Sequence, residues 1–403
     1  MDWGSPAPGA RHEDERRLSK EAPDESVVRG EAEKEGSQLH KSGFRLAAGI
    51  ALAVMIAKRF NKGELIKHLR RKTEMNWTRL QNSSRTLLTV TTLVLSALVA
   101  VLTVGSPAQE GKWYPSEWGQ DDQRGAANRI TPAKVLEGAS LIRTGKIYQL
   151  GRLYEHGMPM PGQRHFKLTI PGSPTGGPDG ENGIISHDEM ISGEIGQVGT
   201  QFDGLGHVGI RENGVNLFYN GFKSEEFATA YGLTKLGVEN VGVFFTRGIL
   251  LDVKRLKRVD RLLPGYVITP ADIEACLKAQ KIDIREGDVV LFHTGHGQLW
   301  MKDNDTYGGG EPGIGMAAAK YLTDRKIAMV GADTWAIEVV PHENPDRPFE
   351  VHQWMLPKHG VYNIENLDTS ELARDRAYEF AFVFSPLRLK GATGSPGNPI
   401  AVR

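Results

Sequence analysis

The alternation of strand-like and helix-like segments is the feature that most limits what this chain can form. It begins near Glu110 and continues to the C-terminus. Thr131-Pro132 and Thr269-Pro270 each place a capping hydroxyl before a first-turn proline, and an amphipathic stretch follows each pair. Buried strands are indicated by four runs: RGILLDV at 247–253, VVLFH at 289–293, IAMVGAD at 327–333 and YEFAFVFSPL at 378–387. Strands that alternate with helices predict an α/β fold.

The first part of this region differs from the second. Between Lys146 and Ile210, strand patterns occur without a helical period, so we expect a β-rich half before a more mixed half. A segment rich in glycine and proline at 171–182 is too long for a simple turn. Its pattern fits a mobile lid and a plain surface loop equally well.

The N-terminal hundred residues have a composition of their own. Residues 1–40 contain few large apolar side chains and cannot bury a core. From Met75 onward, Arg79 and Arg85 precede an uncharged apolar run at 87–104, and Ser106-Pro107-Ala108 supplies small residues after it. A positive flank, an apolar centre and small residues are the three parts of a secretory signal.

We therefore divide the chain into three parts. Residues 1–74 are expected to be a disordered or mis-assigned extension, 75–108 a signal peptide, and 109–403 the functional domain. This predicts a periplasmic or secreted protein. The alternative is a membrane anchor, because the eighteen residues at 87–104 just suffice to cross a bilayer if they are not cleaved.

Composition excludes several classes of function. The formal net charge of zero gives no support to a nucleic-acid-binding surface. Cys276 is the single cysteine, so the chain contains no internal disulfide and no cysteine-rich zinc site. Its place in the helix-like stretch TPADIEACLKAQ predicts a core residue.

The segment QVGTQFDGLGHVG, at 197–209, ends in the spelling of a dinucleotide-binding turn, G-x-G-x-x-G. Such a turn needs a helix directly after its glycines. The turn signals Asn213-Gly214 and Asn220-Gly221 follow instead, and no helix N-terminus is available for a phosphate. We expect no nucleotide cofactor.

The same segment has the side chains of a metal site. In an extended strand, residues two apart share a face, so Gln197, Gln201 and Asp203 would line one side, with His207 just beyond the bend. Five glycines within 196–209 let polar groups approach one point without Cβ clashes. A glycine-rich turn with hydrogen-bonded polar groups is the alternative.

This segment resembles the signature of the cyclase family of metal-dependent hydrolases, which includes kynurenine formamidase (arylformamidase) and isatin hydrolase. The signature is H-x-G-T-H-x-D-x-x-x-H. Four positions match in register: Gly199, Thr200, Asp203 and His207. Gln197 and Gln201 stand where the family usually has metal-binding histidines. Three later blocks resemble the family in the same order: VVLFHTG at 289–295, VGADTW at 330–335 and VHQWMLPKHGVYNIENL at 351–367. The resemblance covers roughly 115–395.

The resemblance implies a fold and a metal. The fold would be the family's α/β arrangement, a β-rich core layered with α-helices of the swivelling β/β/α type, commonly as a homodimer. Further metal ligands would be His352 and Glu365, each a polar residue beside apolar runs where burial is expected. Asp203 and Glu365 together neutralise one divalent ion, so we expect one Mn²⁺ or Zn²⁺. An amide oxygen from glutamine is a poorer donor to zinc than imidazole.

The resemblance also implies a chemistry. His207 matches the family's catalytic histidine and would act as general acid and base on a metal-activated water. Asp333, Trp335 and Trp354 are candidates for binding the small-molecule substrate, although a turn-capping aspartate and core tryptophans fit the same pattern. His293 and His296 have the spacing of a ligand pair and also of a strand-to-turn hydrogen bond.

The predicted function is an exported, arylformamidase-like hydrolase of an amide, formamide or lactam. One alternative is a polyketide-type cyclase or dehydratase that uses the same site. Another is a non-catalytic small-molecule binder without metal, in which the glutamines contact the ligand.

Overall fold

The computed structural model describes residues 112–403. The expected extension at 1–74 and the expected signal peptide at 75–108 lie outside the described residues. Between residues 112 and 403, the helices are too short or too polar to cross a membrane.

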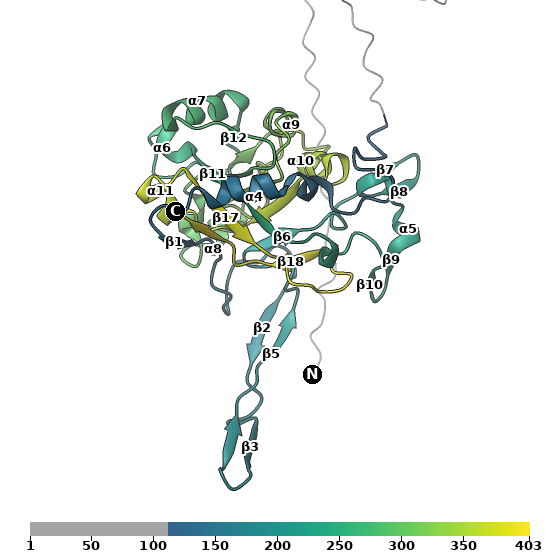
Figure 1. The fold of residues 1–403 in the computed structure, drawn as a ribbon, viewed down its shortest axis with the longest axis vertical. Helices are drawn as coiled ribbons and strands as arrows, with labels where there is room; N and C mark the ends of the chain where they lie inside the picture. Colours follow the sequence, from purple (N-terminus) through teal and green to yellow (C-terminus); the bar gives the residue numbers. More distant parts are fainter. Residues whose placement is uncertain (1–111) are drawn as a thin grey trace, which may run out of the picture. The chain divides into compact units, whose positions relative to one another are not determined.

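A nine-stranded mixed sheet forms the centre of the domain (Figure 1). Its four middle strands, β11, β13, β15 and β16, run parallel, and the strands outside them run antiparallel to their neighbours. In spatial order the sheet contains β1 (Ile147–Gln149), β19 (Ile400–Val402), β17 (Glu379–Phe384), β11 (Phe244–Asp252), β13 (Val289–His293), β15 (Met329–Ala332), β16 (Tyr362–Glu365), β6 (Gln201–Asp203) and β18 (Gly394–Pro396). The predicted α/β class is confirmed, and all four predicted buried strands form.

Helices connect the parallel strands, as the alternating pattern predicts. They are α6 (Val253–Lys257), α7 (Pro270–Gln280), α8 (Asn304–Gly308), α9 (Met316–Asp324), and α10 (Glu350–Gln353) with the π-helical turn Trp354–Lys358. A further helix, α11 (Ser370–Asp375), leads from β16 to the antiparallel strand β17. Both predicted caps are present. Thr131 accepts a hydrogen bond from the Lys134 amide at the start of α4 (Pro132–Ala139), and Thr269 forms a capping box with Asp272 at the start of α7.

Short ribbons complete the domain. They are β7 (Ile210–Glu212) with β8 (Val215–Leu217), β9 (Ala228–Thr229) with β10 (Gly232–Leu233), and β12 (Val267–Ile268) with β14 (Gly313–Ile314), and a short helix, α5 (Ser224–Phe227), follows β8. Two apolar cores cover the two faces of the sheet. Phe202 of β6 stacks on Tyr362 of β16 in one core, and Cys276 of α7 is buried in the other, as predicted.

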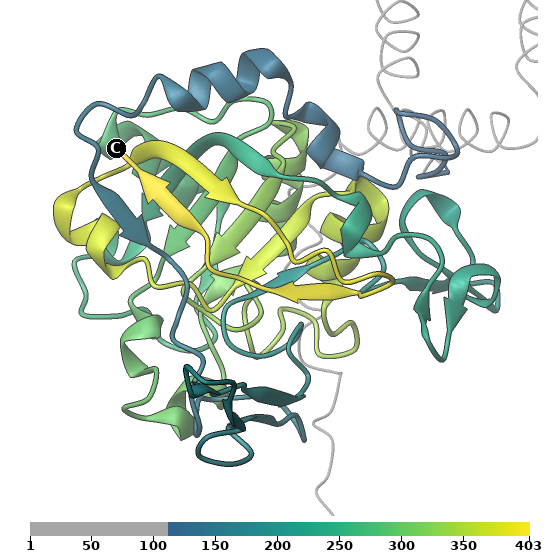
Figure 2. The same ribbon diagram turned by 60° about the horizontal axis from the view of Figure 1, so that its bottom comes forward.

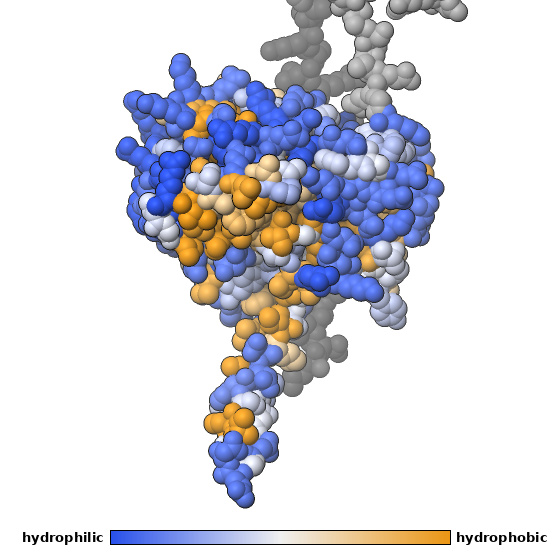
Figure 3. Space-filling view, in the orientation of Figure 1, coloured by the Kyte–Doolittle hydropathy of each residue, from blue (hydrophilic) through white to orange (hydrophobic). Residues whose placement is uncertain are grey.

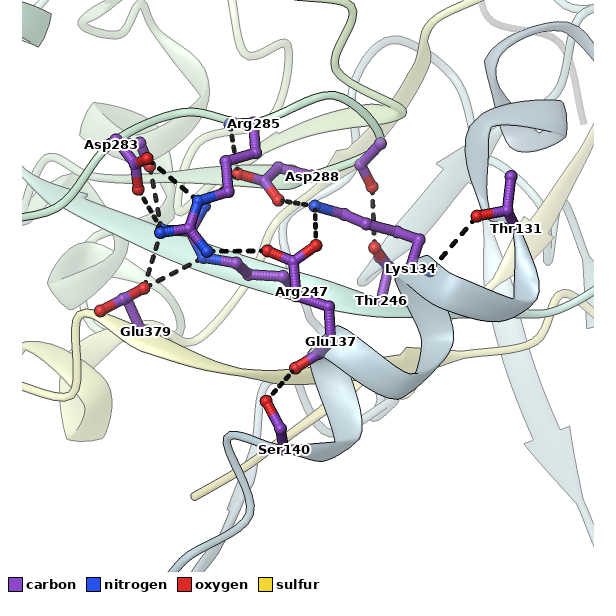
Figure 4. A network of polar contacts seen from close by, with 11 residues as sticks. Thr131, Lys134, Glu137, Ser140, Thr246, Arg247, Asp283, Arg285, Asp288 and Glu379 are labelled. Atoms are coloured by element: carbon purple, nitrogen blue, oxygen red, sulfur yellow. Dashed lines mark hydrogen bonds and ion pairs between the residues drawn. The ribbon is translucent and has the colours of Figure 1, made fainter.

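A buried group of charges attaches α4 to the sheet, and the helix lies beside the strands (Figure 2). Lys134 of α4 and Arg247 of β11 both point at the carboxylate of Asp288, which precedes β13 (Figure 4). The guanidinium of Arg247 also donates to Glu379 at 2.8 Å and to Asp283 at 3.0 Å. Because charges of both signs meet, each buried ion keeps a partner that compensates its lost hydration.

The segment at 171–182 belongs to a two-stranded arm that projects from the domain (Figure 1). The arm is built from β2 (Phe166–Thr169) paired with β5 (Met190–Gly193), and from β3 (Gly176–Asp179) paired with β4 (Ile184–Ser186) near its tip. The segment is therefore part of a hairpin rather than a simple surface loop. Six large apolar side chains along the arm are at least half exposed: Leu168, Ile170, Ile184, Ile185, Met190 and Ile191.

Candidate metal centre

The candidate metal centre lies where β6 and β16 pair. Their antiparallel register sets Gln201 opposite Glu365 and Asp203 opposite Asn363. Opposite residues in such a pair project to the same face, and residues two apart in one strand do so as well. Four polar side chains therefore gather on one face, while Phe202 between them points into the apolar core on the other.

Helix α10 brings His352 to this face. The Nε2 atom of His352 lies 3.2 Å from Oε1 of Glu365 and 3.8 Å from Oδ2 of Asp203. Potential ligand atoms of Asp203, His352 and Glu365 all lie within 4.8 Å of one another, and all three side chains are buried. The structure thus brings together the two halves of the site, which are separated by about 150 residues in the sequence.

Three oxygen atoms at this centre have no hydrogen-bond partner among residues 112–403. They are Oε1 of Gln201, Oδ2 of Asp203 and Oδ1 of Asn363, and all are buried. A buried acceptor without a partner costs about 1–3 kcal/mol, so native structures rarely leave one unpaired. A cation would satisfy these oxygens together with the imidazole of His352. The residues present therefore fit a divalent ion.

The two glutamines contact the carboxylates of this cluster. The side-chain amide of Gln201 donates from Nε2 to Oε2 of Glu365 at 2.6 Å, and that of Gln197 donates to Oδ1 of Asp203 at 3.1 Å. An ionised carboxylate accepts hydrogen bonds only, so each amide must turn its nitrogen toward it. The glutamines thus orient the carboxylates, and Gln201 has its oxygen left over for a cation.

Burial and crowding of charge perturb this cluster. Burial raises the pKa of the Glu365 carboxyl to about 7, and the neighbouring charge of Asp203 adds to the rise. Burial lowers the pKa of His352, but its hydrogen bonds to Glu338 and Glu365 and their charges outweigh burial and raise that pKa well above its ordinary value. A bound divalent ion would replace the protons on Glu365 and His352 as the source of positive charge.

His207 lies beside this cluster on its more open side. Its Nε2 atom is 3.9 Å from Oδ1 of Asp203, and its side chain is 25% exposed whereas that of Asp203 is 1% exposed. An imidazole in this position is accessible to a small molecule and lies beside a buried carboxylate. The geometry suits a proton acceptor.

Comparisons with known proteins assign the family. The family described as "Putative cyclase" matches residues 148–339. A solved structure described as a novel cyclase is 36% identical in sequence, with a TM-score of 0.63, and the match covers 71% of this chain and 98% of that one. The chain belongs to the cyclase family.

Other solved structures match this chain at lower sequence identity. Isatin hydrolase A from Ralstonia solanacearum is 19% identical with a TM-score of 0.50, over 67% of this chain and 95% of that one. A predicted metal-dependent hydrolase from Bacillus stearothermophilus is 22% identical with a TM-score of 0.42, over 64% of this chain and 98% of that one. A search of curated proteins found no match.

Glu338 is a member of this cyclase-family site that the sequence pattern did not reveal. Its carboxylate accepts hydrogen bonds from Nδ1 of His352 and from the His352 backbone amide, the latter at 3.2 Å. A carboxylate behind a metal-binding histidine fixes the ring orientation and strengthens its other nitrogen as a donor. The available signal was a single acidic residue within the apolar run AIEVV at 336–340.

Trp335 lies near the metal centre. Its ring contacts that of Phe349, with centroids 6.5 Å apart, and the Phe349 ring lies 5.4 Å from that of His352. Its backbone amide donates to the buried carboxyl of Glu311 at 2.6 Å. The indole Nε1 is buried and has no hydrogen-bond partner among the described residues. Trp335 thus offers an apolar ring and a donor without a partner among the described residues, and the Phe349 ring links it to His352.

Trp354 and Asp333 are placed elsewhere. The Trp354 indole donates to Oγ1 of Thr323 on α9 at 3.0 Å, so its side chain contacts the helix layer. Asp333 accepts hydrogen bonds from the backbone amides of Thr294 and Gly295, both at 2.9 Å, and shapes the turn after β13. Neither residue joins the cluster formed by Asp203, His352 and Glu365.

His293 and His296 do not form a ligand pair. His296 is buried, and its Nε2 atom lies 3.1 Å from the carbonyl oxygen of Tyr307. His293, at the end of β13, has its Nδ1 atom 2.7 Å from Oγ1 of Thr369. The strand-to-turn hydrogen bonding that the sequence allowed is the observed arrangement.

Proposed function

We propose that this cyclase-family chain is a metal-dependent hydrolase that cleaves the C–N bond of an amide, formamide or lactam. One observation carries the proposal: the buried cluster of Asp203, His352 and Glu365 has unpaired oxygens at its centre and a half-buried imidazole, His207, at its edge. Isatin, which gives its name to a protein of the same fold, is a lactam and a direct first substrate to test.

The donor set supports one divalent ion. Asp203, Glu365 and His352 would hold it, with the amide oxygens of Gln201 and Asn363 as further donors. Carboxylate and amide oxygens favour Mn²⁺ over Zn²⁺ more than the family's histidines do. Once bound, such an ion supplies Lewis-acid polarisation of a carbonyl group and lowers the pKa of water.

The protein's own residues would manage the proton. Nε2 of His207 would take a proton from the attacking water and return it to the leaving nitrogen as the C–N bond breaks. Oδ1 of Asp203, 3.9 Å away, would stabilise the imidazolium that forms in between. Gln197 holds that carboxylate oxygen in place at 3.1 Å.

Glu338 would keep His352 in the tautomer that binds metal. When Nδ1–H of His352 donates a hydrogen bond to Glu338, the lone pair on Nε2 faces Asp203 and Glu365. The backbone amide of His352 donates to the same carboxylate, so both groups approach it in a fixed orientation.

The test is a metal analysis combined with an activity screen. The purified protein is expected to bind one Mn²⁺ per chain and to hydrolyse isatin or a formanilide in a chelator-sensitive manner. Bound metal without cleavage of any C–N substrate would instead favour a cyclase or dehydratase. Tight ligand binding by a metal-free protein would favour a non-catalytic binder.

We propose that the protein is exported. The support is the sequence from Met75 to Ala108, with its positive flank, apolar centre and small residues. N-terminal sequencing of the protein from the periplasm and medium tests this. A mature N-terminus near Ala108 is expected, and an intact chain in the membrane fraction would indicate an anchor.

We also propose a homodimer, supported by the exposed arm. Figure 3 shows apolar residues on the face of the domain that carries β17 and β18, and they continue onto the neck of the arm. Exposed apolar side chains outside the arm include Ile147, Leu153 and Leu387. Contiguous apolar surface of this kind is typical of contacts between subunits.

A further inference from the structure

A second site candidate is a cavity at the carboxyl ends of β11 and β13. Its volume is about 670 Å³. Asp203, His352 and Glu365 are not among its lining residues, so it is not the metal centre. The carboxyl ends of parallel strands are where α/β proteins bind ligands, and the volume lies in the range of small-molecule pockets.

Positive charge dominates the lining. Six cationic side chains line the cavity against three acidic ones; the cations are Arg152, Lys254, Arg255, Arg258, Lys302 and Arg374, and the acids are Asp252, Asp333 and Asp368. Arg255 pairs with Asp252, and Arg374 with Glu371. The other four cations form no salt bridge within residues 112–403.

The acidic side chains are occupied by the protein's own donors. Asp252 caps α6 by accepting from the Arg255 amide at 2.9 Å. Asp333 accepts from the Thr294 and Gly295 amides. Asp368 accepts from the amide and hydroxyl of Ser370. Their oxygens accept hydrogen bonds within turns, and the charge of Asp368 also interacts with Arg152. Three acids against six cations still leave the lining with an excess of positive charge.

Two groups in the lining are held in fixed orientations. Nη2 of Arg152 donates to the carbonyl oxygens of Gly297 at 3.0 Å and Leu367 at 3.1 Å, and the guanidinium lies 5.2 Å from the Trp300 ring. Its Nε is buried without a partner in the described part of the chain. His293 is 6% exposed, and within 112–403 only its Nδ1 is hydrogen-bonded, to Thr369. The same nitrogen lies 3.5 Å from Oδ2 of Asp333.

We propose that this cavity binds a small organic anion through a carboxylate or phosphate group. Arg152 and His293 would contact the anionic group, because a preorganised guanidinium and an imidazole are both donors to oxyanions. Lys254, Arg258 and Lys302 would supply the surrounding positive potential. This site does not depend on the proposed hydrolase activity.

The test compares anion binding by matched variants of the full chain. Inorganic phosphate and succinate are titrated by calorimetry at low salt into chelator-treated protein. The variant Arg258→Glu/Lys302→Glu reverses two exposed charges of the cavity. The control Lys278→Glu/Lys281→Glu makes the same charge change around the end of α7, outside the cavity.

Binding of one or both probes is expected to weaken by about 10-fold or more in the cavity variant, because reversing two cations lowers the charge around the bound anion by four units. The control variant should retain affinity. Binding of succinate alone would identify a carboxylate as the preferred anionic group, and binding of phosphate alone would identify a phosphate group. Absence of binding, or equal weakening in both variants, would overturn the proposal. Loss of binding in Asp203→Asn would also overturn it, because that result would place the anion at the metal centre.

Discussion

Nε2 of Gln201 lies 2.6 Å from Oε2 of Glu365 across the β6–β16 pair. A residue that stands in the place of a usual histidine ligand therefore holds a neighbouring carboxylate, and its own oxygen faces the cluster unpaired. This dual role makes Gln201 the residue at which metal choice and carboxylate orientation are coupled.

Gln201→Leu is expected to lower Mn²⁺ affinity about 10- to 100-fold, because it removes an oxygen donor and frees Glu365. Competition with a fluorescent chelator measures the affinity. Gln149→Leu, on the exposed edge strand β1, is the matched control and should bind normally. Unchanged affinity in Gln201→Leu would contradict a role in the metal centre.

The thermal stability of the metal-free protein should fall as pH rises from 5 to 8. The pKa of Glu365 is raised from 4.5 to about 7 in the folded chain. Protonation of Glu365 therefore stabilises the folded chain fully below pH 4.5, and this stabilisation is lost as the pH rises through about 7. The raised pKa of His352 acts in the same direction. Mn²⁺ replaces these protons, so its stabilising shift in Tm should be larger at pH 8 than at pH 5. Differential scanning fluorimetry measures both, and Glu365→Gln should flatten the profile. An Mn²⁺ shift independent of pH would count against this linkage.

His207→Ala should reduce turnover by about 10²- to 10⁴-fold, the usual contribution of a general acid and base. Metal content and Tm should stay at wild-type values, because His207 is partly exposed and is not one of the three clustered ligands. His156→Ala, at an exposed position, serves as the control. Full turnover in His207→Ala would remove it from the mechanism.

Glu338→Gln is expected to weaken Mn²⁺ binding about 10- to 100-fold while leaving the fold intact. The amide keeps the shape of the side chain but cannot accept from Nδ1 of His352 as a carboxylate does. Glu343→Gln, whose carboxylate caps α9 at the surface, is the matched control. Equal affinities in the two variants would show that Glu338 does not position His352.

The arm should determine the oligomeric state. The wild-type chain is expected to elute as a dimer in size-exclusion chromatography with light scattering, and Ile184→Glu/Ile185→Glu should elute as a monomer, because both exposed side chains become charged. Tyr231→Glu/Leu263→Glu makes the same change at exposed positions of the body. A monomeric wild-type protein would refute the homodimer.

Local patterns predicted the sheet and its helices well, because buried parallel strands such as 289–293 are continuous apolar runs and Thr269-Pro270 marks a helix start. The arm was missed as a hairpin, since its tip is rich in glycine and proline and lacks an apolar alternation. Strand spacing indicated Asp203 as a metal-site residue, whereas His352 and Glu365 were assigned as ligands through the family resemblance.

Asn363 and Glu338 could not be found from the sequence alone. Asn363 becomes part of the site because the antiparallel register sets it opposite Asp203, 160 positions earlier, and nothing near Asn363 encodes that pairing. Glu338 depends on how α10 lies against the preceding turn. Both require the tertiary structure.

The buried charges of Figure 4 also decide where an independently folding fragment can begin. The family match starts at residue 148, but Lys134, a partner of Asp288 in the interior, precedes it. Loss of one member of a buried ion pair destabilises a protein by about 3–5 kcal/mol. A fragment cut at the family boundary would therefore lack a counter-ion of its own interior, and the shortest viable truncation must retain the whole of α4 and its Thr131 cap.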